Sequence, residues 1–238
     1  NDFQAYLDQI REETVATKDD VLYRALKNYN DFSGKYMGNV SSTEGPWTHE
    51  IELDEGYILC LYGINSTIIS NADDHFNRHD NNPRKMRVGN HQIPKRQDKK
   101  IFMTICHHPT DNWGEDISEI LDERAMIQLY GHKHVQTLDA DNIRIKIGTG
   151  ALQPDRREAD WQPRYNFLTI ELKSERLEIT LYPRIWNESI RKFVKEDISC
   201  DEGQNCKKII ISMKSEPIVK SDINEMKPTQ KVRETSDS

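Results

Sequence analysis

Three histidines directly follow two apolar segments of this 238-residue sequence. His107 follows the apolar run 101–106, and His132 and His134 follow the run 125–130. Runs of this kind are typical of strands buried on both faces, and ligands gather beyond the carboxyl ends of such strands in an open α/β sheet. Two neighbouring strands that end in histidines would direct imidazoles to one spot, and neutral imidazole is a good ligand for zinc, manganese and iron.

The spacing inside the second motif favours chelation. One residue separates His132 from His134, which places both imidazoles on the same side of an extended segment because side chains alternate with period two. Gly131 allows the backbone to turn sharply just before them. Each motif alone is a weak indicator of a metal site, but two such motifs in this order, with one predicted helix between them, are much more specific.

In this order the motifs resemble the C-terminal half of calcineurin-like metallophosphoesterases. Residues 106–109 (Cys-His-His-Pro) match the fourth motif of that family, and residues 131–134 (Gly-His-Lys-His) match the fifth. The resemblance covers roughly residues 1–195. Weaker likenesses lie at Asn65 and Ser66, at residues 89–92 and 147–151, and at Arg184 and Trp186.

The resemblance implies an α/β fold, namely the C-terminal part of a four-layer α/β/β/α metallophosphoesterase sandwich. It also implies two divalent metal ions (Mn, Fe or Zn), with His107 and His132 on one metal and His134 on the other. Apart from the resemblance, we expect His108 to bind the phosphate of the substrate; the alternative is that it fixes the loop. In such centres the metals lie roughly 3.5–4 Å apart and hold a hydroxide that attacks phosphorus in line. The implied activity is metal-dependent hydrolysis of phosphate mono- or diesters.

The first three family motifs are absent from strand ends of this sequence. Asp73 and His75 spell part of the first motif, and Asn90 and His91 part of the third, but all four lie in the polar segment 70–98. We predict that this segment is a surface loop, because even one βαβ unit needs ~30 residues and cannot fit between the two lookalikes. We therefore expect no catalytic carboxylate within this chain, place it upstream of Asn1, and expect the chain alone to be inactive.

Two other functions stay open. The chain could be a catalytically inactive phosphoesterase-like module that binds or regulates a partner, or a mononuclear zinc domain with three histidine ligands. The sequence upstream of Asn1 distinguishes the first of these from an enzyme. The substrate, the metal and the oligomeric state are left open by the sequence.

Apolar periodicity predicts the scaffold that positions the histidines. The resemblance implies the C-terminal part of a metallophosphoesterase domain over residues 1–199, and we expect a C-terminal extension over 200–238, disordered from about residue 213. The predicted elements are a helical region over 1–32, a buried strand formed by the apolar run 56–64 within the segment 51–64, the strands 101–106 and 125–130, a helix with Ile117, Ile120 and Leu121 on its apolar face, and half-buried strands over 143–148, 165–172 and 177–182.

Composition narrows the partners. The formal net charge is −7, which argues against an overall basic nucleic-acid binder, so nucleic acid is expected only as a substrate. No apolar run reaches the ~18 residues of a membrane span, and no secretory leader is visible. Cys60 and Cys106 lie in apolar runs, whereas Cys200 and Cys206 lie in a polar stretch. We predict reduced thiols in a cytoplasmic protein.

Overall fold

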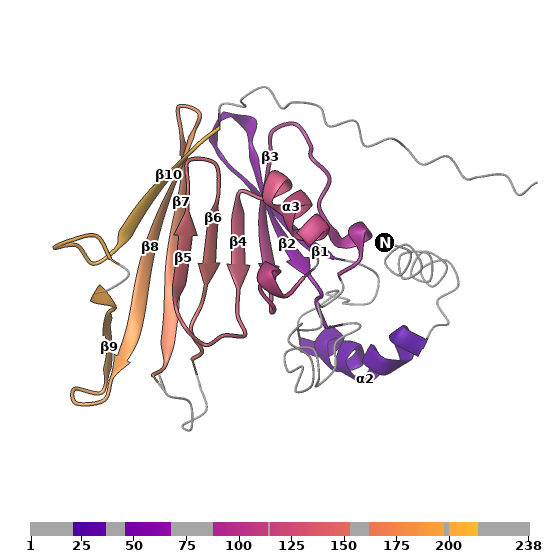
Figure 1. Cartoon of the computed structure of the whole chain (residues 1–238), viewed down its shortest axis with the longest axis horizontal. Coiled ribbons are helices and arrows are strands. Elements are labelled where there is room, and N and C mark those ends of the chain that lie inside the picture. Colours follow the sequence, from indigo (N-terminus) through magenta and orange to yellow (C-terminus); the bar gives the residue numbers. More distant parts are fainter. Residues whose placement is uncertain are drawn as a thin grey trace, which may run out of the picture.

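A computed structural model describes residues 21–36, 46–67, 88–113, 115–152, 162–197 and 200–213. Its centre is a six-stranded sheet, sheet A, in which four neighbouring strands are parallel and the two edge strands are antiparallel to them (Figure 1). In spatial order the strands are β1 (Trp47–Glu52), β2 (Ile58–Ile64), β3 (Lys100–Cys106), β4 (Ile127–Tyr130), β6 (Ile145–Gly148) and β5 (Thr137–Ala140).

A second sheet, sheet B, is antiparallel throughout. Its central strand β8 (Arg176–Asn187) pairs with β7 (Arg164–Lys173) over most of its length. It also pairs with β10 (Lys207–Ser212) through residues 176–181 and with β9 (Lys192–Lys195) through residues 184–187. Buried residues alternate with half-buried ones along β8 and with exposed ones along β10, as expected for strands with one face on the core.

The two sheets pack face to face through aliphatic side chains. Both faces of the parallel strands of sheet A are apolar, so each face needs a covering layer. Sheet B covers one face. The buried residues of this first core are Leu59, Ile101, Met103, Ile127, Ile145 and Ile147 from sheet A, and Leu172, Leu177, Ile179, Leu181, Ile209 and Ile211 from sheet B.

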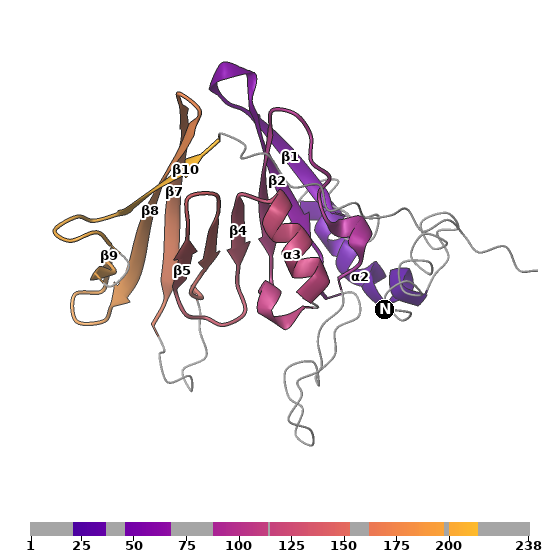
Figure 2. The ribbon, with the colours of Figure 1, turned by 45° about the horizontal axis from the view of Figure 1, so that its top comes forward.

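The helix α3 (Glu115–Arg124) covers the opposite face of sheet A (Figure 2). Its buried side chains Ile117 and Leu121 contact the second core, which also holds Trp113 at 1% exposure. The described residues thus form three layers in the order helix, sheet A, sheet B. The helix α2 (Val21–Tyr36) lies away from sheet B, on the side of β1 and β2.

The structure confirms the predicted α/β fold and the two apolar strands that precede the histidines. The apolar run 56–64 forms β2, as predicted, but the sequence did not reveal β1: a short 3₁₀ helix, η1 (Asp54–Gly56), separates β1 from β2 and turns them into an antiparallel hairpin. Glu55 and Gly56 have positive φ there (60° and 73°), which reverses the chain direction.

The predicted surface loop over 70–98 is only partly described, and its described end is not all surface. Val88 and Ile93 are buried in the core beneath α3, and Gln92 is also buried. The physical reason is that the chain must cross the covered face of sheet A to enter β3. Residues 70–87 lie outside the described residues.

Sequence patterns gave no indication of β5, β9 and β10. β10 matters most, because Ile209 and Ile211 pack in the core between the sheets, so the predicted extension from residue 200 begins with a strand of sheet B. The predicted disordered tail beyond residue 213, and the predicted helical region over 1–20, lie outside the described residues. No helix of the described residues is long and apolar enough to span a membrane.

We predict that β10 contributes to global stability. Ile211 is fully buried and Ile210, its neighbour on the opposite face, is 52% exposed. Ile211→Ala should lower the free energy of unfolding by about 2–5 kcal/mol, because it leaves a cavity between the sheets. The matched variant Ile210→Ala should lower it by less than about 1 kcal/mol. Urea denaturation compares the two, and equal effects would show that β10 does not pack in the core.

Candidate metal centre

The histidines gather because β3 and β4 end at the same level of sheet A. The two strands are parallel, and their last residues, Cys106 and Tyr130, are direct partners in the ladder. The N–H of Gly131 then donates to the carbonyls of Cys106 (3.3 Å) and His107 (3.1 Å), which ties the two chain segments together beyond the sheet. His107 and His132 are thereby held side by side.

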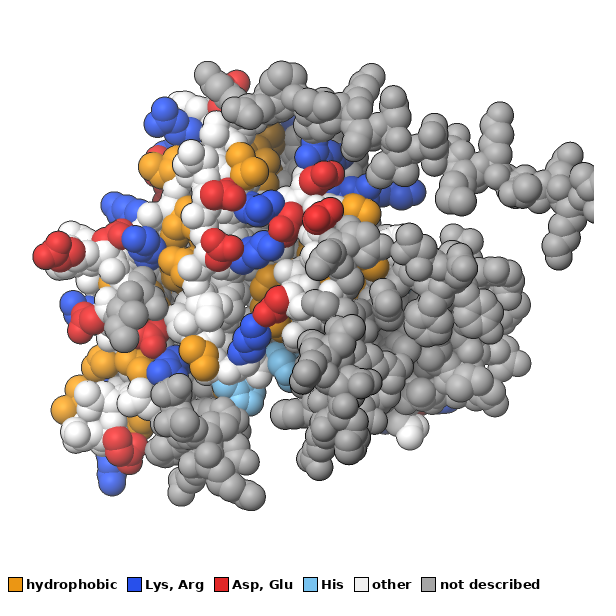
Figure 3. All heavy atoms as spheres, in the orientation of Figure 1, with side chains coloured by type: hydrophobic (Ala, Val, Ile, Leu, Met, Phe, Trp, Pro, Cys, Tyr) orange, Lys and Arg blue, Asp and Glu red, His pale blue; other side chains and the backbone are white. Residues whose placement is uncertain are grey.

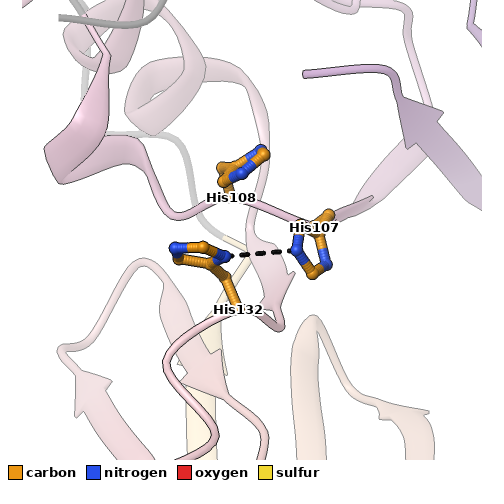
Figure 4. Close-up of side chains that lie close together, drawn as sticks. All are labelled: His107, His108 and His132. Carbon is orange, nitrogen blue, oxygen red and sulfur yellow. Dashed lines mark hydrogen bonds between the residues drawn. The ribbon is translucent and has the colours of Figure 1, made fainter. Parts of the chain in front are cut away.

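Three imidazoles form a compact group, the histidine cluster of His107, His108 and His132. His132 Nδ1 lies 3.2 Å from His107 Nε2, and the candidate ligand atoms of the three residues lie within 4.8 Å of one another (Figure 4). His107 is exposed, His132 is half-buried and His108 is only 5% exposed. Figure 3 shows histidine side chains at the surface along the lower edge of the molecule.

The spacing of His107 and His132 fits a divalent metal ion. Two nitrogens that bind a tetrahedral zinc at 2.0–2.1 Å lie about 3.3 Å apart. His132 Nδ1 and His107 Nε2 are in hydrogen-bond contact at 3.2 Å, a separation close to the one that a shared metal requires. Both ligands are imidazoles, which suit zinc, iron and manganese.

The loop from 131 to 136 is bent, which corrects two sequence-based expectations. The left-handed backbone conformation belongs to His132 (φ 67°) and His134 (φ 54°), not to Gly131. Because the segment is not an extended strand, the period-two rule does not place its two imidazoles on one side. His134 is half-buried and is not a member of the histidine cluster. Its role as the ligand of a second metal stays a prediction.

Buried hydrogen bonds fix the end of β2 beside the cluster. The side-chain amide of Gln92, 1% exposed, forms a two-point clamp on Asn65: Asn65 N–H donates to Gln92 Oε1 and Gln92 Nε2 donates to Asn65 O, both at 2.8 Å. Asn65 Oδ1 accepts from the backbone N–H and hydroxyl of Thr67 (2.9 and 2.8 Å). Asn65 thus caps the turn that follows β2.

Ser66 and Cys106 lie directly beneath His108. The hydroxyl of Ser66, 2% exposed, lies 2.8 Å from His108 Nδ1, and the backbone N–H of His108 donates to the same oxygen at 3.4 Å. Burial raises the pKa of the Cys106 thiol to about 11, although hydrogen bonds from Ser66 and nearby backbone N–H groups act in the opposite direction. Sequence reasoning assigned no role to Ser66; its position two residues past the end of β2 was the available signal.

The lookalike motifs do not join the cluster. Asn90 and His91 are exposed in the 3₁₀ helix η2 (Asn90–Gln92), as predicted, and neither belongs to the group of candidate ligands. Asp73 and His75 lie outside the described residues. All four cysteines are free, and Cys60, Cys106 and Cys206 are buried.

One charged pair lies at the rim of the cluster. The ammonium of Lys133, between the two loop histidines, pairs with Asp111 in the 3₁₀ helix η3 (Thr110–Asn112). Both side chains are about half exposed, so solvent screens the pair and it adds little to stability. Its effect is local, because it joins the two loops that carry the histidines.

A cavity of about 420 Å³ lies at the opposite end of the sheet, near the first residues of β3 and β4. Its arginines already have partners: Arg96 donates to Glu123 O at 2.6 Å and Arg124 to Pro94 O at 3.3 Å. Cations at a helix C-terminus stabilise its unpaired carbonyls, so these side chains hold the end of α3. No histidine lines this cavity.

Comparison with known proteins adds no function. No model of a known protein family matches the sequence, and no curated protein matches it. Two chains of solved structures match. One, described as a hypothetical protein from Thermus thermophilus, is 12% identical with a TM-score of 0.30, over 73% of this chain and 64% of that one. This chain thus spans 64% of that structure's length, and so low a TM-score indicates neither a shared fold nor a shared function.

The Gln92 clamp generates a stability prediction. Gln92→Ala removes both hydrogen bonds to Asn65 and leaves a partly buried N–H and C=O without that partner, so we expect a loss of about 1–3 kcal/mol in the free energy of unfolding. The control is Gln97→Ala, at an exposed position, with an expected effect near zero. Urea denaturation measures both, and an unchanged Gln92→Ala protein would contradict the clamp.

Proposed function

We propose that this chain supplies the histidine ligands of a metal centre that hydrolyses phosphate mono- or diesters. The observation that carries the proposal is the 3.2 Å separation of His132 Nδ1 and His107 Nε2 at the carboxyl ends of two adjacent parallel strands. The likeness of residues 106–109 and 131–134 to two metallophosphoesterase motifs supports it. His107 and His132 would hold one divalent ion, and His134 a second.

Each residue of the cluster has a separate task in this proposal. A bound divalent ion supplies Lewis-acid stabilisation of a phosphoryl oxygen and a water of lowered pKa. His107 and His132 set the position of that ion through the fixed ends of β3 and β4. His108 would bind a phosphoryl oxygen of the substrate. The Lys133–Asp111 pair holds the two loops in register.

We also propose that the chain forms the C-terminal part of a four-layer α/β/β/α sandwich. The layers α3, sheet A and sheet B supply three of the four. On the outer face of sheet B, Phe167 is 61% exposed and Ile210 is 52% exposed, which suits a face that a further helical layer would cover. Four free cysteines support a reducing compartment such as the cytoplasm.

The first test measures metal binding by the 238-residue chain. Titration calorimetry with Zn²⁺ or Mn²⁺ should detect binding to the unmodified chain, and both His107→Ala and His132→Ala should weaken it by about 100-fold or more, because each removes a direct ligand. His49→Ala is the matched control: His49 is an exposed histidine of β1 outside the cluster, and its loss should leave affinity unchanged. Equal affinity in all variants would exclude this site.

The second test measures hydrolysis. We expect the chain extended by the in-frame sequence that precedes Asn1 to hydrolyse bis(p-nitrophenyl) phosphate with Mn²⁺. A chelator should abolish turnover and added Mn²⁺ should restore it, and His132→Ala and His134→Ala should each abolish it. Metal binding without hydrolysis in the extended chain would instead favour a phosphoesterase-like binding or regulatory module.

A further inference from the structure

Ser66 is a buried hydroxyl at the cluster that the proposed metal binding does not require. It lies beyond the end of β2, the strand beside β3, and its oxygen is 2.8 Å from Nδ1 of His108. Both residues are nearly inaccessible, with exposures of 2% and 5%. A hydrogen bond between two buried groups is hard to exchange for water, so it constrains the protonation pattern of the imidazole.

The direction of this hydrogen bond follows from the other partners of the hydroxyl. A serine hydroxyl has one proton to donate and two lone pairs that accept. The backbone N–H of His108 already donates to Ser66 Oγ, so two acceptors compete for the hydroxyl proton: His108 Nδ1 and the Cys106 sulfur. An imidazole nitrogen is a much better acceptor than a thiol sulfur. The hydroxyl proton therefore goes to His108 Nδ1, while the oxygen accepts the N–H.

A neutral imidazole whose Nδ1 accepts a hydrogen bond carries its proton on Nε2. Such a ring has no lone pair left for a metal ion. We infer that Ser66 is a positioning residue that fixes His108 in the Nε2–H tautomer, so that His108 donates a hydrogen bond to an oxyanion and is not a third metal ligand. The role of the oxyanion as a phosphoryl oxygen rests on the proposed function, whereas the tautomer is a property of this chain alone.

The surrounding structure explains why Ser66 holds this position. Gln92 clamps the preceding residue, Asn65, through two hydrogen bonds of 2.8 Å, and Asn65 in turn binds Thr67 on the other side of Ser66. The backbone on both sides of Ser66 is thus fixed by hydrogen bonds. The cluster thus has two parts. His107 and His132, whose nitrogens lie 3.2 Å apart, would bind the metal ion, and His108 would donate a hydrogen bond.

The tautomer can be observed directly by long-range ¹H–¹⁵N NMR of the chain labelled with ¹⁵N-histidine. His108→Gln identifies the resonances of His108 by their loss. We expect Nδ1 of His108 in the range of an unprotonated nitrogen and Nε2 in the range of a protonated one, and one equivalent of Zn²⁺ should leave this pattern unchanged. A protonated Nδ1 in the free chain, or an Nε2 that loses its proton to zinc, would overturn the inference.

Variants of Ser66 separate positioning from structural support. Ser66→Ala should abolish the preference for one tautomer, and Ser66→Thr, which keeps the hydroxyl, should restore it. Because Ser66 supports no metal ligand in this scheme, Zn²⁺ affinity of Ser66→Ala should stay within about twofold of the unmodified chain. A fall in Zn²⁺ affinity of about tenfold or more would indicate that Ser66 supports a metal-bound histidine, and it would contradict the inference.

If the Ser66→Ala protein does not fold, a comparison of His108→Gln with His107→Ala still tests the inference. His108→Gln should keep its Zn²⁺ affinity within about twofold, while His107→Ala loses it, and equal losses in the two would make His108 a ligand and contradict the inference. If the unmodified chain binds no zinc, the proposed function fails, but the tautomer of His108 in the metal-free chain still decides the present inference.

Discussion

The in-register end of two parallel strands is the constraint on which the candidate site depends. Cys106 and Tyr130 are ladder partners, so the next residues of both chains leave the sheet at the same height and must find new hydrogen-bond partners. Gly131 satisfies this need by donating to the carbonyls of Cys106 and His107. The imidazoles of His107 and His132 meet as a result. A one-residue shift in this register would turn the strand faces over and separate the two rings.

The layers on each side of sheet A make that register unambiguous. Apolar contacts with sheet B on one face and with α3 on the other leave the strands no alternative alignment that buries the same side chains. The polar groups of the site are then confined to the carboxyl ends of the strands, where Gln92 binds Asn65 and Ser66 binds His108. Burial of these amides and hydroxyls is tolerated because their hydrogen bonds are made within the protein.

The sequence predicted the parts of the fold that rest on strong local signals. The apolar runs before His107 and His132 indicated β3 and β4, and the apolar face of Ile117 and Leu121 indicated α3. Sequence patterns missed β5 and β1, whose residues are nearly all exposed. Local patterns marked Ser66 and residues 89–92 only as weak likenesses, and the hydrogen bonds of Ser66 and Gln92 could not be predicted from them, since the partners lie 42 and 27 residues away in the chain. The expectation that His134 lies on the same side as His132 assumed an extended backbone, whereas both residues have positive φ.

The left-handed conformation of His132 and His134 sets chemistry against stability at this loop. A side chain with a Cβ in this region of φ and ψ costs roughly 1–2 kcal/mol, although histidine is among the residues that adopt it more readily. Glycine would relax the backbone at either position but would delete an imidazole. Selection for stability alone would therefore remove both histidines, and a chain that keeps them carries a standing thermodynamic penalty. Engineering of a more stable variant should leave these two positions unchanged and seek its gains in the two cores.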